Sequence, residues 1–599
     1  MARIRSRLLP FAPLLFLNFL FFTEKVKSLV VSSAPNPEVG VMRYFVIPLV
    51  GLSIGATIFL LLFKWEKSDD LAARCEMLLQ GKEKKFLLGL TFIFLLLHLA
   101  LSLSSYFTHH LGFFDFGVYD AKIWQISVAP NLEEKLKIAS TGHLQPILIL
   151  YSLGYSLVDF PGILLILQAL ATLSGVIPLY LLCKRKTDNS LIIVGLTLLY
   201  LLYPPLAFNS IVDFHPDHLY IPILLWAFYF AEENKYITLL PFLLLGCLIK
   251  EPYVLGAAFF GIYLLWRHKS LVFGLCILSF CLVLFYEVTF HVLPQTTFPQ
   301  SEKTILQGSD FSYLGSSPLS ILSNTMLHPL SFLKRILQVP KLRFPFFVLY
   351  PFIFLPLLRI KEFVPAFPFL LIPLLSTNLH HQNVASQYTA GIIPPLFVGL
   401  ILLFVWVKDR FGQRIVFALL TLMVVLSLSL NLAHSPLPFS VNFWSKSWSF
   451  GRWHYSNYFK REHEKQLEKA IDLIPKDARL KVVIHSGIYH KRLFHRFDFD
   501  CFPKGLENAD YLILDNTRGY LFCDQRVSET EYLDKVNQIK QNPRFNRIFD
   551  RSGILVFKRK PISNTARLLI PPSNSYVGVR ALLFHPQTLQ SDFFQRDHQ

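Results

Sequence analysis

The stretch FLLGLTFIFLLLHLALSLSSYF at residues 86–107 runs directly into THHLGFFDFGVYD at residues 108–120. The first part is an apolar run of the length that a helix needs to cross a bilayer, about 20 residues. The second part places two acids, Asp115 and Asp120, where that helix reaches water. Carboxylates at this depth are candidates for a catalytic or binding role. The alternative is that they mark only the end of the hydrophobic segment.

Composition indicates the class of protein. The chain has 599 residues, of which 53% are hydrophobic, 16% are charged and 57 are phenylalanines, and its mean hydropathy is +0.43. These values exclude a soluble protein of this size. The net charge of +18 fits lysines and arginines in short cytoplasmic loops that face anionic lipid. We therefore predict a polytopic membrane protein that does not bind nucleic acid.

About thirteen apolar runs are candidates for membrane spans, each needing roughly 20 residues or somewhat fewer within a bundle. They lie near residues 8–22, 44–63, 86–107, 161–182, 190–206, 219–231, 237–249, 253–266, 270–293, 344–358, 363–375, 391–407 and 413–433. The run at 144–158 contains Pro146 and Gly154, which predicts an interfacial or re-entrant segment. The first run follows three arginines and could instead be a signal peptide.

Basic residues in short loops predict the orientation, because such loops stay in the cytoplasm. The N-terminal arginines, the linker at 64–85 and the loops at 184–186, 267–269, 359–361 and 408–414 carry Lys and Arg, whereas the opposite loops at 207–218 and 376–390 carry none. The polar clusters between the apolar runs then all face the non-cytoplasmic side. Convergence on one face is what an active site requires. The expected substrate-binding residues are Asp120, His143, Asp213, His215, His218, Lys250, Glu251, His380, His381 and Tyr388.

Asp115 is the candidate catalytic residue of the first outer loop, which covers residues 108–160. Tyr119 follows it by four positions, so one helical turn would place both side chains on a shared face. Partial desolvation by Phe113, Phe114 and Phe116 would raise the proton affinity of the Asp115 carboxylate, which could then take a proton from an acceptor hydroxyl. An ordinary helix N-cap is the equally weighted alternative.

The motif DFHPDH at 213–218 concentrates donors and acceptors. Its acids are four residues apart and its histidines three apart, a density that could coordinate a divalent metal or hold a phosphate. We regard Asp115, His215 and Asp217 as metal-ligand candidates for Mg or Mn, with the cofactor itself left open. A polar loop with interfacial histidines is the alternative.

Lys250 and Glu251 form a charged pair between two short apolar runs. A charge at membrane depth costs roughly 2.5 to 3.5 kcal/mol on insertion scales. A lipid-linked phosphate would offset this cost as a partner of Lys250, and mutual neutralisation with Glu251 is the alternative.

The composition changes after residue 434. Residues 460–473 predict an amphipathic helix, and 481–485, 511–515 and 554–557 predict buried strands of a small α/β domain. The chain thus divides into N-terminal helices with a basic linker (1–85), a transmembrane core (86–434), an extracytoplasmic α/β domain (435–560) and a tail (561–599). Cys501 and Cys523 share the α/β domain and could pair if that compartment is oxidising.

Taken in order, these motifs resemble those of a known family. FDFGVYD, then GHLQPILILYSLGYSL, DFHPDH, the Lys250–Glu251 pair, IPKDARL and ADYLILD together resemble the prokaryotic membrane proteins filed as domain of unknown function 2079. That family in turn looks like the GT-C glycosyltransferases. Ala121 and Pro252 depart from the expected pattern, in which Gln and Asp would stand at these two positions.

The resemblance implies a GT-C-like fold in a bacterial or archaeal inner membrane and a reaction at its outer face. A sugar would pass from a polyprenyl-phosphate-linked donor to a glycan, lipid or protein acceptor, with Asp115 as the essential acid of the first outer loop. Two other functions stay open. A transporter would show internal repeats with broken helices, which the sequence does not show, and a non-catalytic binder of lipid-linked glycans would have a nearly identical sequence.

Overall fold

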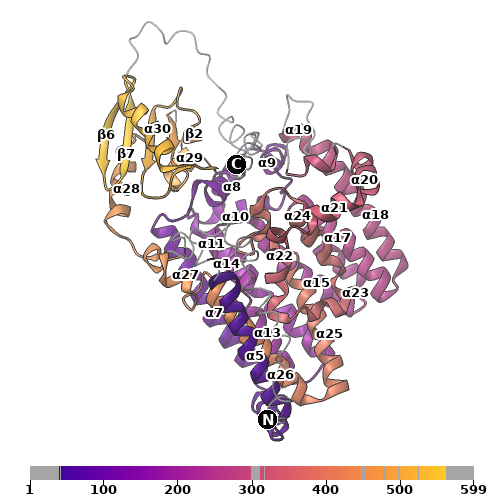
Figure 1. Ribbon diagram of the computed structural model, residues 1–599. Helices are drawn as coiled ribbons and strands as arrows, with labels where there is room; N and C mark the ends of the chain where they lie inside the picture. Colours follow the sequence, from indigo (N-terminus) through magenta and orange to yellow (C-terminus); the bar gives the residue numbers. More distant parts are fainter. Residues whose placement is uncertain are drawn as a thin grey trace.

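The computed structural model describes residues 40, 42–297, 310–315, 317–446, 453–476, 480–496, 498–523 and 525–560. The expected first span at 8–22 and the tail at 561–599 lie outside these residues. A bundle of helices makes up most of the molecule, and a small sheet covers one of its ends (Figure 1).

Most of the long helices follow the predicted apolar runs, and several shorter helices lie outside those runs. The helices are α5 (Ile47–Lys64), α6 (Ser68–Leu79), α7 (Glu83–Phe107), α8 (Val118–Val128), α9 (Leu132–Ala139), α10 (Leu148–Leu157), α11 (Gly162–Ser174), α12 (Val176–Lys186), α13 (Ser190–Leu201), α14 (Pro204–Ile211), α15 (Tyr220–Glu232), α16 (Tyr236–Cys247), α17 (Glu251–Tyr263), α18 (Leu271–Glu287), α19 (Leu293–Thr297), α20 (Pro318–Leu327), α21 (Pro329–Ile336), α22 (Val339–Leu349), α23 (Ile360–Phe363), α24 (Phe367–Leu375), α25 (Ile393–Phe411), α26 (Gln413–His434), α27 (Val441–Trp444), α28 (Glu462–Asp472), α29 (Lys491–Arg496) and α30 (Glu529–Gln541). Short 3₁₀ or π turns used below are η3 (Phe113–Gly117), η4 (Pro216–Leu219), η12 (Leu379–Gln382) and η13 (Gln387–Thr389).

Five helical segments are long and apolar enough to cross a membrane. They are Met42–Lys64, Glu83–Phe107, Gly162–Lys186, Leu271–Gln295 and Gln413–His434. Two bent pairs, α13 with α14 and Lys341–Phe352 with Leu355–Leu375, raise the number to seven if each pair is one span. The chain is a multi-pass membrane protein.

The expected number of about thirteen spans is not confirmed within the described residues. The apolar runs at 219–231, 237–249 and 253–266 do form helices, but α15, α16 and α17 have only 12 or 13 residues each. At 1.5 Å per residue such a helix covers about 20 Å, less than the roughly 30 Å hydrocarbon core. Prolines cause the breaks elsewhere: Pro204 and Pro205 follow α13, where the chain bends by 50°.

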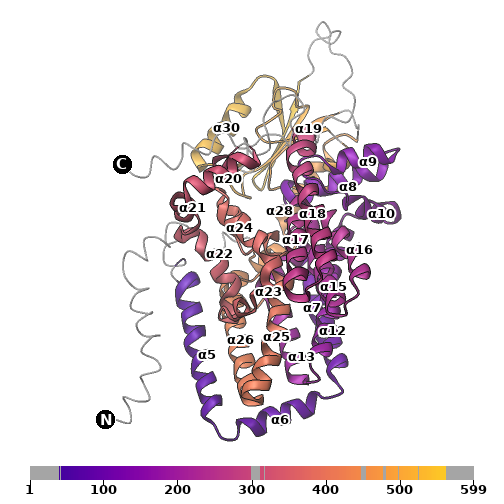
Figure 2. The same ribbon diagram turned by 90° about the vertical axis from the view of Figure 1, so that its right-hand side faces the viewer.

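The two ends of the bundle differ in charge. At the end near α6, Lys184 Nζ lies 3.5 Å from Glu83 Oε1 and Arg414 Nε lies 2.8 Å from Asp69 Oδ2. The basic loops predicted to be cytoplasmic at 184–186 and 408–414 therefore meet at this end. The first outer loop and the sheet lie at the other end (Figure 2).

The C-terminal sheet has five strands in the order β2-β1-β3-β7-β6. β1 (Lys481–Ile484), β2 (Asp498–Cys501) and β3 (Tyr511–Asp515) are parallel, whereas β7 (Ile554–Arg559) pairs antiparallel with β3 and β6 (Phe545–Arg551). A separate hairpin joins β4 (Leu521–Phe522) and β5 (Gln525–Arg526). The predicted helix at 460–473 and the strands at 481–485, 511–515 and 554–557 are confirmed.

The two faces of this sheet belong to different cores, because successive strand residues point to opposite sides. Val483 and Leu512 pack in a local core with Val536 of α30. Val482 and Ile513 instead join the core that is continuous with the membrane helices. The sheet domain is therefore packed onto the bundle and not tethered to it loosely.

Aromatic residues of the first outer loop form much of this junction. The ring of Phe113 lies 5.2 Å from that of Phe494 and 5.6 Å from that of Phe499, and the ring of Phe116 lies 4.8 Å from that of Tyr489. Phe113 and Phe116 are fully buried. The Phe113 amide also donates to the Ser486 carbonyl at 2.8 Å. The loop is thus part of the sheet domain's packing.

Asp120 fastens the same junction. Its carboxylate is fully buried and accepts hydrogen bonds from the hydroxyls of Tyr155 and, at 2.8 Å, Tyr489. His495 Nε2 lies 2.8 Å from Asp120 Oδ2, and the His495 ring stacks on Trp124 with 5.0 Å between centroids. One carboxylate therefore joins α8, α10 and the sheet domain.

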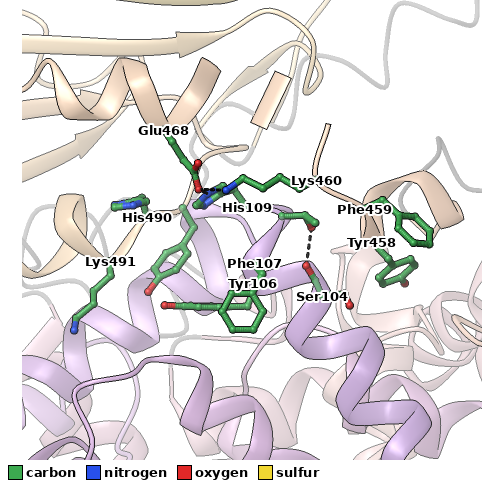
Figure 3. Close-up of a pocket in the computed structure, with 12 residues that line it drawn as sticks. Ser104, Tyr106, Phe107, His109, Tyr458, Phe459, Lys460, Glu468, His490 and Lys491 are labelled. Atoms are coloured by element: carbon green, nitrogen blue, oxygen red, sulfur yellow. Dashed lines mark hydrogen bonds and ion pairs between the residues drawn. The ribbon is translucent and has the colours of Figure 1, made fainter. Parts of the chain in front are cut away.

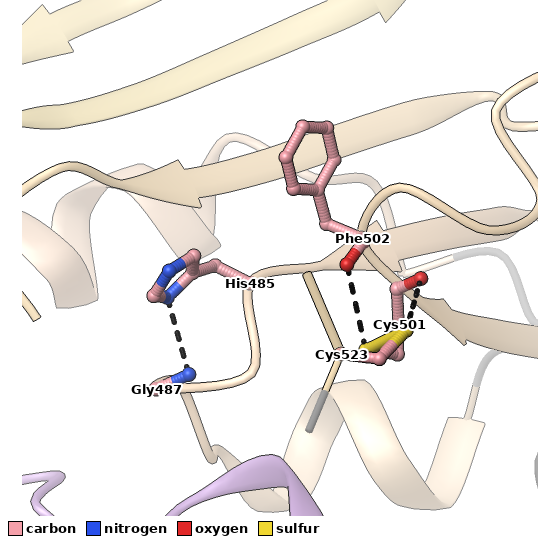
Figure 4. Close-up of a disulfide and its surroundings, with 5 residues drawn as sticks. All are labelled: His485, Gly487, Cys501, Phe502 and Cys523. Carbon is pink, nitrogen blue, oxygen red and sulfur yellow. Dashed lines mark hydrogen bonds between the residues drawn. A yellow bond between two sulfur atoms is a disulfide. The ribbon is translucent and has the colours of Figure 1, made fainter. Parts of the chain in front are cut away.

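Cys501 and Cys523 form a disulfide, with 5.3 Å between their Cα atoms (Figure 4). The bridge links the end of β2 to the residue after β4, and the Cys523 amide also donates a hydrogen bond to the Phe502 carbonyl at 2.8 Å. The pairing that the sequence left open is present.

The Asp120 junction predicts a specific stability effect. Asp120→Ala would leave two hydroxyls and an imidazole buried without their acceptor, so we expect a loss of roughly 3 kcal/mol or more. Tyr489→Phe removes one bond and should cost about 1 kcal/mol. Thermal unfolding of the purified full chain in detergent measures both effects.

Tyr511→Phe is the matched control, because within the described residues the Tyr511 hydroxyl makes no hydrogen bond while its ring is buried in the same sheet. Equal unfolding temperatures for Asp120→Ala and Tyr511→Phe would show that the junction does not depend on Asp120.

Candidate active site

Asp115 and His215 meet at the outer end of the bundle. His215 Nε2 lies 3.1 Å from Asp115 Oδ1, with the Asp115 side chain 49% exposed and that of His215 10% exposed. The residues are 100 positions apart in the sequence. The acid of the first outer loop and the DFHPDH motif were predicted to lie on the same face, and this pair does.

The backbone at Asp115 is unusual. Its φ is +59° and its ψ is −94°, a region that L-residues rarely occupy and that Asp tolerates better than most. The helix that follows, α8, begins at Val118 with Gly117 as its N-cap residue and has no side-chain cap. The helix-cap alternative for Asp115 is therefore wrong, and its carboxylate is directed to His215 instead.

Electrostatics favour a charged pair. Burial by itself lowers the pKa of His215, but the Asp115 carboxylate, by its charge and its hydrogen bond, together with the Asp217 charge, raises the pKa above the usual value for histidine. The raised pKa favours the protonated form of His215, which carries the charge opposite to a carboxylate.

The DFHPDH loop is held in place by hydrogen bonds from neighbouring helices. Gln168 of α11 donates to the carbonyls of Val212 at 3.0 Å and Asp213 at 3.1 Å, and its Oε1 accepts from the His215 amide at 3.2 Å. Tyr253 of α17 donates to Asp217 Oδ1 at 2.7 Å. In the sequence, only its position as a lone amide in an apolar helix distinguishes Gln168.

His218 contacts other protein groups through both ring nitrogens, and Asp213 lies in the same loop. His218 is buried; its Nδ1 contacts the His215 carbonyl, and its Nε2 lies 2.8 Å from the Tyr151 hydroxyl. Asp213 is half-buried at the start of the loop. The buried Asp120 and His218 shape the site and do not line it as the half-exposed Asp115 does.

A second group lies beside the pair. His143 Nδ1 lies 2.6 Å from Glu251 Oε1. Glu251 is therefore bonded to His143, and within the described part of the chain Lys250 forms no ion pair. Burial lowers the pKa of His143, and the Lys250 charge lowers the pKa of both His143 and His215, so Lys250 lies near both imidazoles. The alternative in which Lys250 is neutralised by direct contact with Glu251 is not seen among the described residues.

Lys122 is a further charged residue that sequence reasoning missed. It is 2% exposed, and its Nζ donates to the Thr141 carbonyl at 3.0 Å and to Gln145 Oε1 at 3.3 Å. Gln145 Nε2 donates to the Tyr119 hydroxyl at 3.0 Å. Burial lowers the pKa of Lys122 to about 7. A lysine in the otherwise apolar run AKIW was the available signal.

Tyr388 closes the site from the side of η13. Burial, followed by the charges of Asp115 and Asp217, raises the pKa of the Tyr388 hydroxyl, so this residue lies close to both acids. Its ring is 4.7 Å from that of His381. His381 Nδ1 lies 2.6 Å from Ser376 Oγ and 3.9 Å from Asp310 Oδ2. The side chain of His380 lies outside the described residues.

The metal-ligand candidates do not form a ligand set in this structure. Among the described residues there is no group of three or more His, Cys, Asp or Glu side chains placed to hold a metal ion. Asp115 pairs with His215, while Asp217 accepts from Tyr253. These residues do not fit a metal as they stand.

Comparison with known proteins bears on this site. A family model described as a predicted membrane protein, DUF2079, matches residues 106–482, well over half of the chain. The chain belongs to the DUF2079 family. The matched region of this DUF2079 member contains Asp115, His215, Lys250 and Tyr388.

Among solved structures, the chain is similar to ArnT from Cupriavidus metallidurans bound to undecaprenyl phosphate, with 11% sequence identity and a TM-score of 0.46 over 82% of this chain and 99% of that chain. A similarity this distant does not carry the neighbour's activity over to the present chain. No curated protein matches the sequence.

The Asp115–His215 pair predicts a pH effect. Because the folded-state pKa of His215 is raised, the pair stabilises the fold fully below the pKa of unfolded histidine, about 6.5, and less as pH rises through the folded-state pKa. The gap in unfolding temperature between the wild type and His215→Gln should therefore be larger at pH 6 than at pH 8.5.

Asp115→Asn is the control, since without the carboxylate the same substitution at His215 should show a flatter pH profile. A gap that grows toward alkaline pH would contradict the ion pair.

Proposed function

We propose that this protein is a GT-C-like glycosyltransferase that moves a sugar from a polyprenyl-phosphate-linked donor to an acceptor on the extracytoplasmic face. The observation that carries the proposal is the half-exposed Asp115 carboxylate held 3.1 Å from His215, beside Lys250. A base next to cationic groups suits a reaction that removes a proton and releases a phosphate anion. The resemblance of the ordered motifs to GT-C enzymes supports the same reaction class.

Three observations support an extracytoplasmic location of the site. The basic loops gather at the end of the bundle opposite to the site. The sheet domain at the site's end contains a disulfide, which is typical of an oxidising compartment. The short loops at 207–218 and 376–390 on the site's side lack Lys and Arg. We therefore assign the site and the 435–560 domain to the extracytoplasmic side.

The chemistry is a single displacement. The acceptor hydroxyl oxygen attacks the anomeric carbon while Asp115 takes the hydroxyl proton. The bond between the anomeric carbon and the phosphate oxygen breaks, and the lipid phosphate leaves with the bonding electrons. One displacement inverts the anomeric centre.

His215 orients Asp115 and keeps it ionised, and Lys250 is placed to balance the charge of the leaving phosphate. Buried oxygens of Asp217 and Glu251 have no hydrogen-bond partner in the described structure, and sugar hydroxyls are donors of the kind that they need. His143, Tyr388 and His381 complete the polar surroundings in which we place the sugar and acceptor. No step requires a metal ion.

Asp115→Asn tests the proposal in cells. We expect cells without the protein to lack one glycan product and to accumulate its polyprenyl-linked precursor. The wild-type gene should restore the product, whereas Asp115→Asn should lower its formation by about 100-fold or more, because a general base is removed. Mass spectrometry of extracted lipid-linked glycans and surface polysaccharide measures both.

Glu133→Gln is the matched control, since Glu133 is an exposed acid of the same outer loop on α9. Full product with Asp115→Asn would exclude the proposed role. A transporter would be favoured if sugar crossed proteoliposome membranes and Asp115→Asn did not change this flux. A non-catalytic binder would be favoured if the wild type bound the glycan but formed no product.

A further inference from the structure

The cavity between the outer end of α7 and the sheet domain has a charge-balanced lining. It measures about 420 Å³, and Figure 3 shows Glu468 in contact with Lys460 on its sheet-domain side. Lys491 at its edge pairs with Asp159. The charges of this lining are thus matched by one another. Buried hydrogen-bonding groups that lack a partner within the described residues lie instead near Tyr119.

Tyr119 lies beside the Asp115–His215 pair. Its ring packs edge-on against that of His215, with 5.4 Å between the centroids, and the residue is 9% exposed. Burial raises the pKa of its hydroxyl well above the usual value for tyrosine, and the charges of Asp217, Asp115 and Glu251 raise it further. The hydroxyl therefore keeps its proton and lies close to these carboxylates.

Gln145 fixes the direction of the hydrogen bond at Tyr119. Lys122 Nζ lies 3.3 Å from Gln145 Oε1 and 3.0 Å from the Thr141 carbonyl oxygen, and it donates to both because neither oxygen carries a proton. The amide nitrogen of Gln145 is thereby left for Tyr119, whose hydroxyl oxygen accepts from it at 3.0 Å. The proton of the Tyr119 hydroxyl is not used in this bond, and no acceptor takes it in the part of the chain that the structure describes.

Asp217 presents the complementary acceptor. This residue is 4% exposed. Its Oδ1 accepts from the Tyr253 hydroxyl at 2.7 Å, whereas its Oδ2 has no hydrogen-bond partner among the described residues. A buried carboxylate oxygen without a donor is costly. One hydroxyl group, which is both a donor and an acceptor, could accept from Tyr119 and donate to Asp217.

Given the function proposed above, on which this inference rests, we propose that Tyr119 and Asp217 together bind one hydroxyl of the donor sugar. Gln145 and Lys122 are positioning residues, because they turn the Tyr119 proton toward that hydroxyl. The reacting hydroxyl of the acceptor belongs to the half-exposed Asp115, so the more deeply buried pair is left for the sugar. Tyr119 and Asp217 would then select sugars that carry this hydroxyl, since an analogue without it leaves both groups unpaired.

Native mass spectrometry of the purified full chain tests this site without requiring turnover. The probes are undecaprenyl phosphate that carries glucose, mannose or galactose, the monodeoxy forms of the sugar that the wild type binds best, and undecaprenyl phosphate alone. Tyr119→Phe should bind the best sugar lipid roughly tenfold more weakly, because a buried hydrogen bond is lost. It should bind undecaprenyl phosphate alone like the wild type.

Tyr203→Phe is the matched control, because it removes a buried hydroxyl that donates to the Val348 carbonyl at 2.8 Å inside the bundle. This variant should bind every probe like the wild type. Thermal unfolding confirms that the variants are folded.

One deoxy form identifies the hydroxyl. Wild type and Tyr119→Phe should bind that form equally, although they differ for the other deoxy forms. Gln145→Glu should behave like Tyr119→Phe, because a carboxylate at this position accepts from both Lys122 and Tyr119 and so turns the tyrosine proton away from the sugar. Wild-type binding by Gln145→Glu would contradict the positioning role of Gln145.

The hydroxyl site would be overturned by wild-type affinity of Tyr119→Phe for every sugar lipid, by an equal loss for undecaprenyl phosphate alone, or by an equal loss for every deoxy form. A wild type that binds no sugar lipid more tightly than undecaprenyl phosphate would overturn it as well. Sugar transfer itself is tested by product formation with Asp115→Asn. A chain that binds in the expected pattern but forms no product would therefore retain the hydroxyl site and lose the proposed reaction.

Discussion

The burial of Phe113 and Phe116 in the sheet domain is the constraint on which the site depends. These two rings flank Asp115 and are fully enclosed by Tyr489, Phe494 and Phe499. A positive φ at a residue with a side chain costs about 1–2 kcal/mol, and such a conformation persists only where the surroundings over-determine it. The anchored phenylalanines provide that restraint, so the Asp115 backbone is held where its carboxylate reaches His215.

The partners of the Asp115–His215 pair belong to different parts of the molecule. Asp115 moves with the sheet domain, because its loop is packed into that domain's aromatic core. His215 is tied to membrane helices through Gln168 and Tyr253. The short distance between them therefore depends on how the sheet domain docks. This dependence gives the domain a role in positioning the site, although it carries no catalytic motif of its own.

The sequence predicted features that depend on neighbours along the chain. Apolar runs predicted most of the long helices of the bundle, and short apolar runs predicted β1, β3 and β7, whereas polar helices such as α6, α9 and α30 were not predicted. The count of Lys and Arg in the loops predicted that Asp115 and His215 lie at the same end of the bundle. The number of spans could not be predicted in this way, since length alone does not show where prolines bend a helix. Lys122 was missed because the sequence does not reveal that this side chain is buried, with Thr141 and Gln145 as its hydrogen-bond partners.

Two carboxylates five positions apart illustrate what decides a functional role. The sequence makes both acids site candidates, Asp115 as the catalytic residue and Asp120 as a substrate-binding residue. The partners of Asp120 at Tyr489 and His495, however, lie 369 and 375 residues away, and the Asp120 carboxylate is fully buried. An acid with every oxygen engaged in a dry junction cannot exchange a proton with an incoming hydroxyl. The Asp115 carboxylate, which is half exposed beside His215, can. The difference in burial, and not in chemistry, therefore assigns Asp120 to the scaffold and is the reason why we propose Asp115 as the base.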